Sequence, residues 1–349
     1  MRRSAPAPRA PRLLSVAAGV VVTAAAALAM ACVPPPAPSP PPPGSSETTT
    51  TTIAGSTVER ATTTTAVPAP LPGPGRCPVW QPSSQPTVAA PGLIETSGLA
   101  GGQANPGVWW THNDSGDTAR VFALEGDGRL LTTVTVLGAS AWDWEDMDIG
   151  PGPGGRPYLW VADLGDNGKA RHGGVGYQLY RFAEPSLGVH APTSMSVAAE
   201  RIDVVYPDGR SHNVEATILD PVTGDYFIIT KERRSTIFRI PAASLVPGST
   251  VVPANVGEMM LDDPDSTHDR PVAADISTDG SMIVVKNMEL TYYWHRAPGQ
   301  SVGAALSSTS PCPFERLGSG EAIAFNASNG HLATLAEGHG RPLKRFIRL

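Results

Sequence analysis

The sequence predicts an all-β fold, a β-propeller of five four-stranded blades closed by an N-terminal strand. Short runs rich in Val, Ile, Thr, Trp and Tyr alternate with turns rich in Gly, Asp and Asn, and long runs with helical apolar spacing are missing. A short strand that opens on an acidic residue, a turn and a second apolar strand recur five times. Up to four strand-like runs in about fifty residues are typical of a propeller blade. A sixth, degenerate blade stays open within 183–214 or 241–274.

The first segments of the chain do not belong to these repeats. Residues 1–31 have the pattern of a signal peptide, with four arginines, an apolar run from Leu13 to Met30 and small residues before Cys32. The residues that end at Cys32 resemble a bacterial lipobox, whereas Ala29-Met-Ala31 also suits ordinary signal-peptidase cleavage. An uncleaved membrane anchor is the third alternative, because the apolar run is long enough to span a bilayer.

The three cysteines predict one disulfide and one lipid anchor. Cys77 and Cys312 can pair in an oxidising compartment, which leaves Cys32 available for lipidation. Residues 32–76 are rich in Pro, Thr and Ser and contain too few bulky apolar side chains to form a core, so we expect a disordered stalk. The predicted protein is exported, with its folded domain at 77–349 either anchored to the outer face of the cell membrane or released.

The repeat units follow one another along the folded domain. Their first strands open at Glu95, Glu145, Glu215, Asp275 and Glu321. Their second strand-like runs are Val108–Asp114, Tyr158–Ala162, Asp225–Thr230, Ser281–Val285 and His331–Leu335. Their third runs are Ala119–Leu124, Tyr177–Phe182, Thr236–Ile240, Thr291–Trp294 and Leu343–Leu349, and fourth runs are visible at Leu130–Val136 and Arg201–Val205.

The last unit lacks a fourth strand before the chain stops. We expect Thr87–Ile94 to supply that strand, because closure removes the exposed edge of the sheet. Cys77 lies just before this segment, and Cys312 lies in the outer run of the fourth unit. The predicted disulfide would therefore join two neighbouring blades.

The residues at the strand ends predict a site at one mouth of the central channel. The first two strands of a blade are antiparallel, so the start of the first and the end of the second lie at the same end of the ring. The expected mouth residues are Glu95, His112, Asp114, Glu145, Asp166, Glu215, Lys231, Asp275, Lys286, Glu321 and Glu337.

The acidic residues that open the units allow three interpretations. Ca²⁺ takes several oxygen ligands from carboxylates, so the metal ligands would be Glu95, Glu145, Glu215, Asp275 and Glu321. In the second interpretation, each acid accepts backbone N–H bonds from the adjacent blade and recurs because the blade recurs. Direct acid–base catalysis is the third.

The acidic stretch Asp143–Asp148 divides between two faces. Alternation along a strand sends Asp143 and Glu145 to one face, and Asp146 and Asp148 to the other. Only one of these pairs can face the mouth.

Charge and motif content exclude several classes of protein. The chain has 32 acidic and 26 basic residues, and four of the basic ones lie in the leader, so the remainder carries ten net negative charges. A nucleic-acid partner is therefore not expected, because phosphates require a basic surface. His-Glu-x-x-His, Cys-x-x-Cys, Gly-x-Ser-x-Gly and P-loop patterns are also missing from the sequence.

Several segments between 85 and 349 resemble those of exported bacterial β-propellers of uncharacterised function, and more distantly those of propellers described as having esterase-like activity of phytase. The segments are Glu95–Leu99, Trp110–Gly116, Asp143–Asp146, Asp163–Asn167 and Glu215–Lys231. The resemblance implies calcium ions that hold a phosphate over a ring of carboxylates. The implied acidic residues are Glu95, Asp114, Glu145, Glu215, Asp275 and Glu321, and the implied basic ones are Lys231, Arg233 and Lys286.

Two functions follow from the sequence. The first is an extracytoplasmic, lipid-anchored propeller that serves as a binding or envelope scaffold module, with a small molecule, glycan or protein bound at the acidic mouth. The alternative is a calcium-dependent phosphoesterase or esterase that acts at the same mouth.

Overall fold

A computed structural model describes residues 77–349, apart from 172, 174, 175, 189, 262–269, 309–311, 313–315 and 318. The predicted signal peptide, the predicted stalk and the lipidation site at Cys32 lie outside these residues. The described residues belong to one compact unit, Thr64–Leu349. Within them, every helix is too short or too polar to cross a bilayer.

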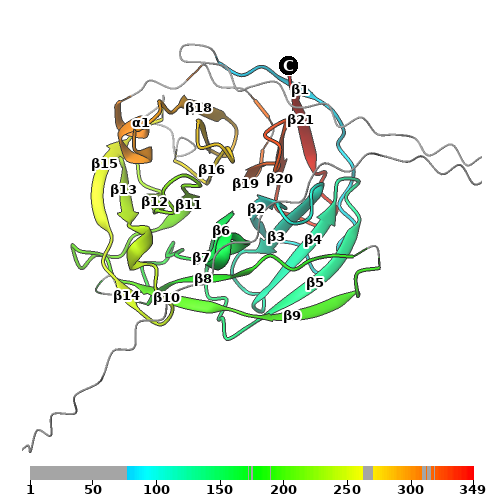
Figure 1. Cartoon of the computed structure of the whole chain (residues 1–349), viewed down its shortest axis with the longest axis horizontal. Coiled ribbons are helices and arrows are strands. Elements are labelled where there is room, and N and C mark those ends of the chain that lie inside the picture. The colour runs from blue at the N-terminus through cyan, green and yellow to red at the C-terminus, as the bar shows by residue number, and fades with distance from the viewer. Residues whose placement is uncertain are drawn as a thin grey trace, which may run out of the picture. The chain divides into compact units, whose positions relative to one another are not determined.

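Five sheets are arranged as blades around a common axis (Figure 1). The first blade contains β2 (Thr96–Gly101), β3 (Val108–Asn113), β4 (Arg120–Glu125) and β5 (Leu130–Leu137). The second contains β6 (Trp144–Pro151), β7 (Pro157–Asp163), β8 (Tyr177–Ala183) and β10 (Glu200–Val204). The third contains β11 (Val214–Leu219), β12 (Tyr226–Thr230), β13 (Ser235–Ile240) and β15 (Ala254–Met259). The innermost strands, β2, β6 and β11, open near Glu95, Glu145 and Glu215 as the repeat predicts.

The last two blades complete the ring. Among the described residues, the fourth blade has three strands, β16 (Ala273–Ile276), β17 (Met282–Lys286) and β18 (Thr291–His295). The fifth contains β19 (Ala322–Phe325), β20 (His331–Leu335), β21 (Lys344–Arg348) and β1 (Trp80–Pro82). The all-β fold and the five-bladed propeller predicted from the sequence are confirmed.

The two loose stretches extend existing blades instead of forming a sixth one among the described residues. In the first stretch, β9 (Ser194–Ala198) pairs in parallel with β5. In the second, β14 (Thr250–Val251) pairs in parallel with β10. Blades one and two therefore have five strands each.

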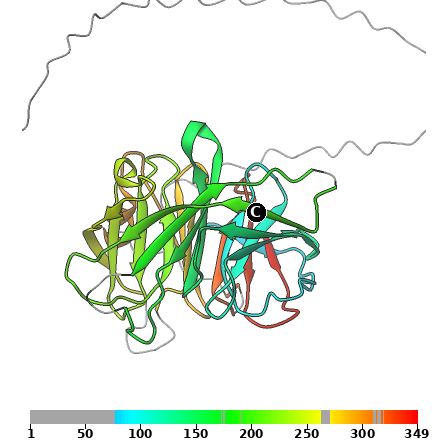
Figure 2. The same ribbon diagram turned by 90° about the horizontal axis from the view of Figure 1, so that it is seen from below.

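Short helices occupy some of the connections in the part of the chain that the structure describes. The helices are η1 (Pro153–Gly155), η3 (Ala242–Ser244) and α1 (Val302–Ser308). In α1, Val302, Ala305 and Leu306 are buried against the apolar cores of blades three and four. The turn between β6 and β7, which contains η1, extends beyond its neighbours in the side view (Figure 2).

An N-terminal strand closes the ring, but it is not the segment expected from the sequence. β1 pairs antiparallel with β21, so it fills the fourth position of blade five. The expected segment, Thr87–Ile94, makes only isolated bridges among the described strands. Its Pro91 has no N–H to donate to a continuous ladder, and its Val88 and Leu93 pack in the core between blades five and one.

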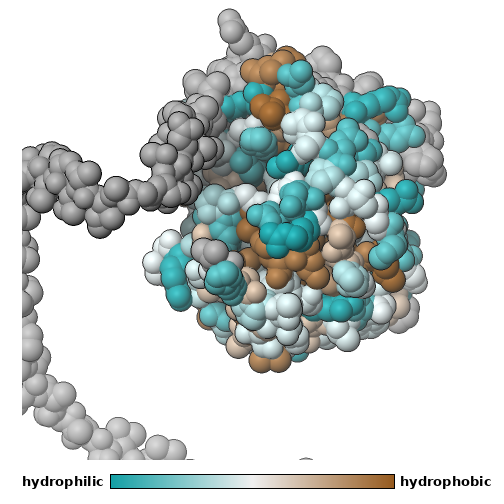
Figure 3. Space-filling view, turned by 90° about the vertical axis from the view of Figure 1, so that its right-hand side faces the viewer, coloured by the Kyte–Doolittle hydropathy of each residue, from teal (hydrophilic) through white to brown (hydrophobic). Residues whose placement is uncertain are grey.

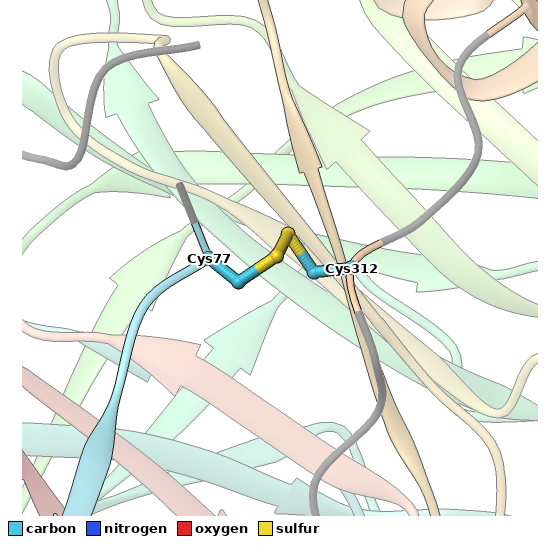
Figure 4. The surroundings of a disulfide bond; sticks show 2 residues. All are labelled: Cys77 and Cys312. Atoms are coloured by element: carbon cyan, nitrogen blue, oxygen red, sulfur yellow. A yellow bond between two sulfur atoms is a disulfide. The ribbon is translucent and has the colours of Figure 1, made fainter. Parts of the chain in front are cut away.

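A disulfide strengthens this closure (Figure 4). Cys77 and Cys312 are bonded, with their Cα atoms 5.6 Å apart and a sequence separation of 235 residues. Cys77 lies three residues before the start of β1 in blade five, and the backbone N–H of Cys312 donates to the carbonyl of Tyr293 in β18 of blade four. The predicted pairing is confirmed, and closing so long a loop stabilises the fold by roughly 3–5 kcal/mol in the chain-entropy model.

The core lies between the blades. Large aromatic side chains fill these spaces, as where Trp160 of blade two meets Tyr226 of blade three with ring centroids 5.3 Å apart. Six of the seven tryptophans are buried, and Trp142 is the exception. On the outside, hydrophilic and hydrophobic residues are interspersed over the side of the propeller that Figure 3 shows.

Candidate functional site

Three of the five innermost strands are irregular where they begin. The irregular stretches are Thr96–Leu99 in β2, Trp144–Met147 in β6 and Val214–Ala216 in β11. In contrast, β16 and β19 pair regularly with their neighbours. A β-bulge changes the direction in which side chains point. Glu145 and Glu215 both lie within these irregular stretches, at the end of the ring that we call the mouth.

Three carboxylates meet at the mouth. Asp114, Asp143 and Glu145 each offer one oxygen, and these oxygens all lie within 4.8 Å of one another. Asp114 follows β3, Asp143 precedes β6, and Glu145 is the second residue of β6. We call these residues the carboxylate triad. Because Ca–O distances are about 2.4 Å, oxygens separated by up to roughly 4.8 Å can share one ion.

Glu145 is the deepest member of the triad. Its side chain is 1% exposed, and its Oε2 atom lies 3.4 Å from the hydroxyl of Ser97, which donates to it. Its Oε1 atom is buried and has no hydrogen-bond partner among the described residues. Burial, together with the charges of Glu215 and Asp114, raises the pKa of Glu145 well above its usual value. A buried carboxylate oxygen without a partner is costly, so a proton or a cation is favoured there.

Gly165 leaves the space that the triad needs. A Cβ atom at this position would clash with Oε1 of Glu145 and would lie 2.6 Å from Cγ of Asp143. The N–H of Gly165 also donates to the carbonyl of Asp143, at 3.1 Å. Glycine is therefore required here by a close approach, and its backbone helps to fix Asp143.

The triad holds protons near neutral pH when no cation is present. Burial, the charge of Asp143 and a hydrogen bond with it raise the pKa of Asp114 to about 7. Burial also raises the pKa of Asp143, although the charge of Arg171 opposes this. A cation and protons would therefore compete for the same oxygens.

A buried ion pair positions Asp143. Arg171 contacts the carboxylate of Asp163, and both side chains are buried. The same carboxylate accepts the N–H of Asp143 at 3.1 Å and that of Trp142 at 3.3 Å. Arg171 also donates to the carbonyls of Asp163 and Gly176, at 2.7 and 2.8 Å. Asp163 therefore holds the backbone of the two residues before β6, and Arg171 holds Asp163 in place.

Lys231 balances part of the negative charge. It contacts the carboxylate of Glu215, and its Nζ lies 3.9 Å from Oε1 of Glu321. Asn213 donates to Oε1 of Glu215 at 3.0 Å. Among the predicted mouth residues, Lys231 is thus close to the acids that open two blades, Glu215 of its own blade three and Glu321 of blade five.

Glu337 connects this pair to the triad. Burial and a hydrogen bond with Glu321 raise the pKa of Glu337 to about 8, and the charges of Glu95 and Asp114 contribute. The structure therefore brings together seven of the predicted residues, namely Glu95, Asp114, Glu145, Glu215, Lys231, Glu321 and Glu337.

Asp166 and His112 lie beside this group and are occupied by local contacts. The carboxylate of Asp166 accepts the N–H of Ala170 at 2.5 Å and the hydroxyl of Tyr177 at 2.9 Å, which holds the loop after β7. His112 is fully buried, and its ring meets that of Trp144 edge-on at 5.4 Å. Burial lowers the pKa of His112 to about 4, so its imidazole is neutral at physiological pH.

Lys286 ends β17 and is also buried. Its Nζ donates to the carbonyls of Asn287 and Met288, at 3.0 and 3.3 Å. Burial and the charge of Lys344 lower its pKa to about 8, and the charge of Glu321 opposes this shift. Its amine therefore neighbours the acidic group but is held by backbone carbonyls.

Asp275 does not lie in the register expected from the sequence. Ala273 pairs with Lys286 without a bulge, so Asp275 is the third residue of β16 and lies further along the channel. Its carboxylate accepts the N–H groups of Phe325 at 2.6 Å and Ile276 at 2.7 Å. It lines a small hollow with residues such as Gly101, at the ends of the innermost strands instead of their beginnings.

Asp146 and Asp148, like Asp275, lie inside the channel and accept backbone N–H groups. Asp146 accepts the N–H groups of Thr217 and Ala274, at 2.8 and 3.3 Å, and so joins three blades. Asp148 accepts the N–H of Leu219 at 2.9 Å. These contacts match the interpretation in which acids bind the backbone of adjacent blades. As alternation predicts, the other pair, Asp143 and Glu145, lies at the mouth.

Asp143 was not among the mouth residues predicted from the sequence, although it belongs to the triad. The alternation of Asp143 with Glu145 was the signal that pointed to it. The predicted set took the acids that open the first strands and the polar residues at or after the ends of the second strands, so it passed over a residue that precedes a first strand.

A wider hollow lies away from the triad. It has a volume of about 700 Å³, and the described residues that line it include Asn105, Glu125, Arg129 and His190. None of the predicted site residues lines it. Glu125 and Arg129 contact each other there as an exposed ion pair, so their charges are already matched.

Comparisons with known proteins find distant structural likenesses and no matching sequence family. No protein-family model matches the chain, and no curated protein sequence matches it. The chain is similar to a structure of U3-55K (TM-score 0.37, 10% identity, 73% of this chain and 68% of that one). It is also similar to hydrazine synthase of Kuenenia stuttgartiensis (TM-score 0.41, 9% identity, 73% and 83%) and to the WD40 repeats of RRP9 (TM-score 0.36, 9% identity, 73% and 67%). Likenesses this distant carry no argument about function.

Proposed function

We propose that this protein is an exported, lipid-anchored binding module that holds a calcium ion at the carboxylate triad. The observation that carries the proposal is the buried Oε1 atom of Glu145, which has no hydrogen-bond partner among the described residues and lies within a triad of carboxylates. A cation would satisfy this oxygen, and its charge would oppose the burial and the neighbouring negative charges that raise the pKa of Asp114 and Asp143.

The donor atoms favour calcium over other cations. The triad consists of carboxylates without histidine or cysteine, which suits hard cations and not zinc. Ca²⁺ accepts irregular sets of six to eight oxygens, whereas Mg²⁺ demands near-ideal octahedral geometry. Three carboxylates from two blades provide part of such a set, and water or a ligand would complete it.

Titration of the folded domain, residues 77–349, with Ca²⁺ tests this site. We expect measurable heat and an increase in melting temperature, and we expect Asp143→Asn to abolish both. Asp127→Asn is the matched control, because it removes an equal charge from an exposed turn where its oxygen accepts only the N–H of Arg129. Absence of heat and of stabilisation in the wild-type domain would refute calcium binding.

The export part of the proposal is supported by the disulfide and by the leader sequence. A bond between Cys77 and Cys312 is typical of oxidising compartments. We expect the full chain to incorporate a fatty-acid label in a bacterial host, and Cys32→Ser to lose the label. A wild-type protein that is exported without label would refute lipidation and leave the other two alternatives, release by signal peptidase and an uncleaved anchor, which the size of the exported chain distinguishes.

A calcium-dependent phosphoesterase is the second candidate, and one observation favours it. Glu337 has a pKa of about 8, so it holds a proton at neutral pH, and it lies beside Glu321, which is near Lys231. A protonated carboxyl and an ammonium next to a cation are suited to donating a proton to a leaving group and to binding a phosphate.

A screen of phosphoesters and carboxylic esters tests this candidate. We expect calcium-dependent turnover that Glu337→Gln reduces by about 100-fold or more, because general acid catalysis typically contributes 10²- to 10⁴-fold. Asp127→Asn again serves as the control. Turnover that is equal in Glu337→Gln and wild type, or no turnover with any ester, would leave the binding module as the function.

A further inference from the structure

Trp142 is unusual among the tryptophans of this protein. Its side chain is 56% exposed, whereas the other six tryptophans are at most 6% exposed. A large aromatic side chain buries 150–250 Å² when it packs into a core, so leaving one in water forgoes a substantial stabilisation. An exposed tryptophan of this kind is a candidate contact for a ligand.

The ring of Trp142 is held in place before any ligand arrives. The guanidinium of Arg171 lies 4.8 Å from its centroid, and Arg171 is itself buried against the ring of Tyr177, at 4.9 Å. The backbone N–H of Trp142 donates to the carboxylate of Asp163 at 3.3 Å. A ring that is already ordered loses little entropy on binding.

Trp142 is joined to the carboxylate triad through its neighbour. Asp143 is the next residue, and consecutive Cα atoms are about 3.8 Å apart. The carboxylate of Asp163 accepts the N–H groups of both residues. One buried ion pair, Arg171 with Asp163, therefore positions the exposed ring and a triad carboxylate together.

We propose that the ligand of the mouth is a carbohydrate, whose sugar ring stacks on Trp142 while neighbouring hydroxyls complete the coordination of a calcium ion at the triad. This inference rests on the proposed calcium site. A sugar has an apolar C–H face that suits an aromatic ring and hydroxyl oxygens that suit a hard cation. Three carboxylates leave coordination positions that a pair of hydroxyls can fill.

The charges around Trp142 favour a neutral ligand over a cationic one. An aromatic ring beside carboxylates is also a possible site for an ammonium group. Here, however, the Arg171 guanidinium already lies against the ring, and a calcium ion in the triad would repel a second cation. A polyhydroxyl ligand fits both features without adding charge.

Binding of the domain to immobilised mannan, galactan and glucan, with Ca²⁺ or with a chelator, tests the inference. We expect at least one polysaccharide to bind in Ca²⁺ and to be released by the chelator. Trp142→Ala should weaken this binding tenfold or more while calorimetry gives an unchanged affinity for Ca²⁺. Trp142→Phe should retain part of the binding, because a smaller ring can still stack. Asp143→Asn should lose both Ca²⁺ and polysaccharide.

The outcomes separate this inference from the calcium site beneath it. Failure of Ca²⁺ to bind the wild-type domain would refute both proposals. Intact Ca²⁺ binding without binding of any polysaccharide would overturn the carbohydrate proposal alone. So would polysaccharide binding that is equal in Trp142→Ala and wild type, or binding of tetramethylammonium that depends on Trp142 and persists in the chelator.

Discussion

Two sets of buried or half-buried carboxylates occupy the centre of this propeller and differ in their partners. Asp146, Asp148 and Asp275 lie inside the channel, and each accepts backbone N–H groups from adjacent blades. Asp114, Asp143 and Glu145 lie at the mouth, close to one another, and one oxygen of Glu145 has no hydrogen-bond partner among the described residues. The difference teaches that residue type and burial do not separate structural acids from candidate ligands, whereas hydrogen-bond satisfaction does.

The regular and irregular strand openings underlie this difference. Where β16 pairs regularly, its acid points to the backbone of β19. Where β6 is bulged, Glu145 joins the triad while Asp146 still binds adjacent blades. A single extra residue thus allows one strand to supply both kinds of carboxylate.

The largest loss of stability is expected from a substitution of Asp146. Asp146→Ala would leave the N–H groups of Met147, Thr217 and Ala274 without their acceptor. Because an unsatisfied buried group costs about 1–3 kcal/mol, we expect a loss of roughly 3 kcal/mol or more in the free energy of unfolding, measured by urea denaturation. Asp146→Asn keeps an acceptor oxygen and should lose less. Equal stability of Asp146→Ala and wild type would refute the structural role that we assign to the acids inside the channel.

Gly165→Ala should disturb the triad through its shape. The added Cβ would clash with Glu145, so we expect a destabilisation of about 1–3 kcal/mol, as for other overpacked sites, together with weaker Ca²⁺ binding. Gly168→Ala is the control, since a Cβ there meets no atom within 4 Å. Thermal melts with and without Ca²⁺ would measure both effects, and identical behaviour of the two variants would contradict the packing argument.

Glu145→Gln and Asp148→Asn should separate the two sets by their response to calcium. We expect Glu145→Gln to weaken Ca²⁺ binding tenfold or more, equivalent to about 1.4 kcal/mol, because it removes a triad charge. Asp148→Asn should bind Ca²⁺ like the wild type, since its oxygens serve Thr217 and Leu219. Calorimetry measures both affinities. The reverse pattern would place the cation inside the channel.

The smallest effect is expected from pH. The pKa of Asp114 is raised from 3.8 to about 7 in the folded state, so the protonated form stabilises the fold fully below pH 3.8, and this stabilisation is lost as pH rises through about 7. Without Ca²⁺, the melting temperature should therefore fall between pH 5 and pH 8. Stabilisation by Ca²⁺ should be greater at pH 8, and Asp114→Asn should flatten the profile. A melting temperature that rises between pH 5 and pH 8 would contradict a raised pKa of Asp114 in the folded state.

Strand period and cysteine number predicted much of the fold. The repeated acidic strand openings predicted five innermost strands, and the two cysteines of the folded domain predicted the bond between Cys77 and Cys312. The predicted closing strand was wrong. Thr87–Ile94 and Trp80–Pro82 are both short segments before the first repeat, and side-chain packing decides which of them pairs with the last blade. Val88 and Leu93 fit the space between blades, which leaves β1 to pair with β21.

The candidate site was less accessible to sequence reasoning. Repetition identified acids at strand openings but gave no information on bulges, so Asp275 was placed in one register with Glu145. The side chain of Trp142 could not be distinguished from the buried Trp144 two residues later, because both belong to the same strand period. Arg171, which positions Asp143, lies on a distant loop and has no sequence signal of its own.

The sequence by itself determined the period of the strands, the number of blades and the accumulation of acids near their beginnings, because these depend on local alternation and turn residues. The tertiary structure alone decided which acids are satisfied by backbone N–H groups and which face one another, because neighbouring blades supply both the donors and the opposing charges. A carboxylate becomes a candidate ligand only through what surrounds it in space.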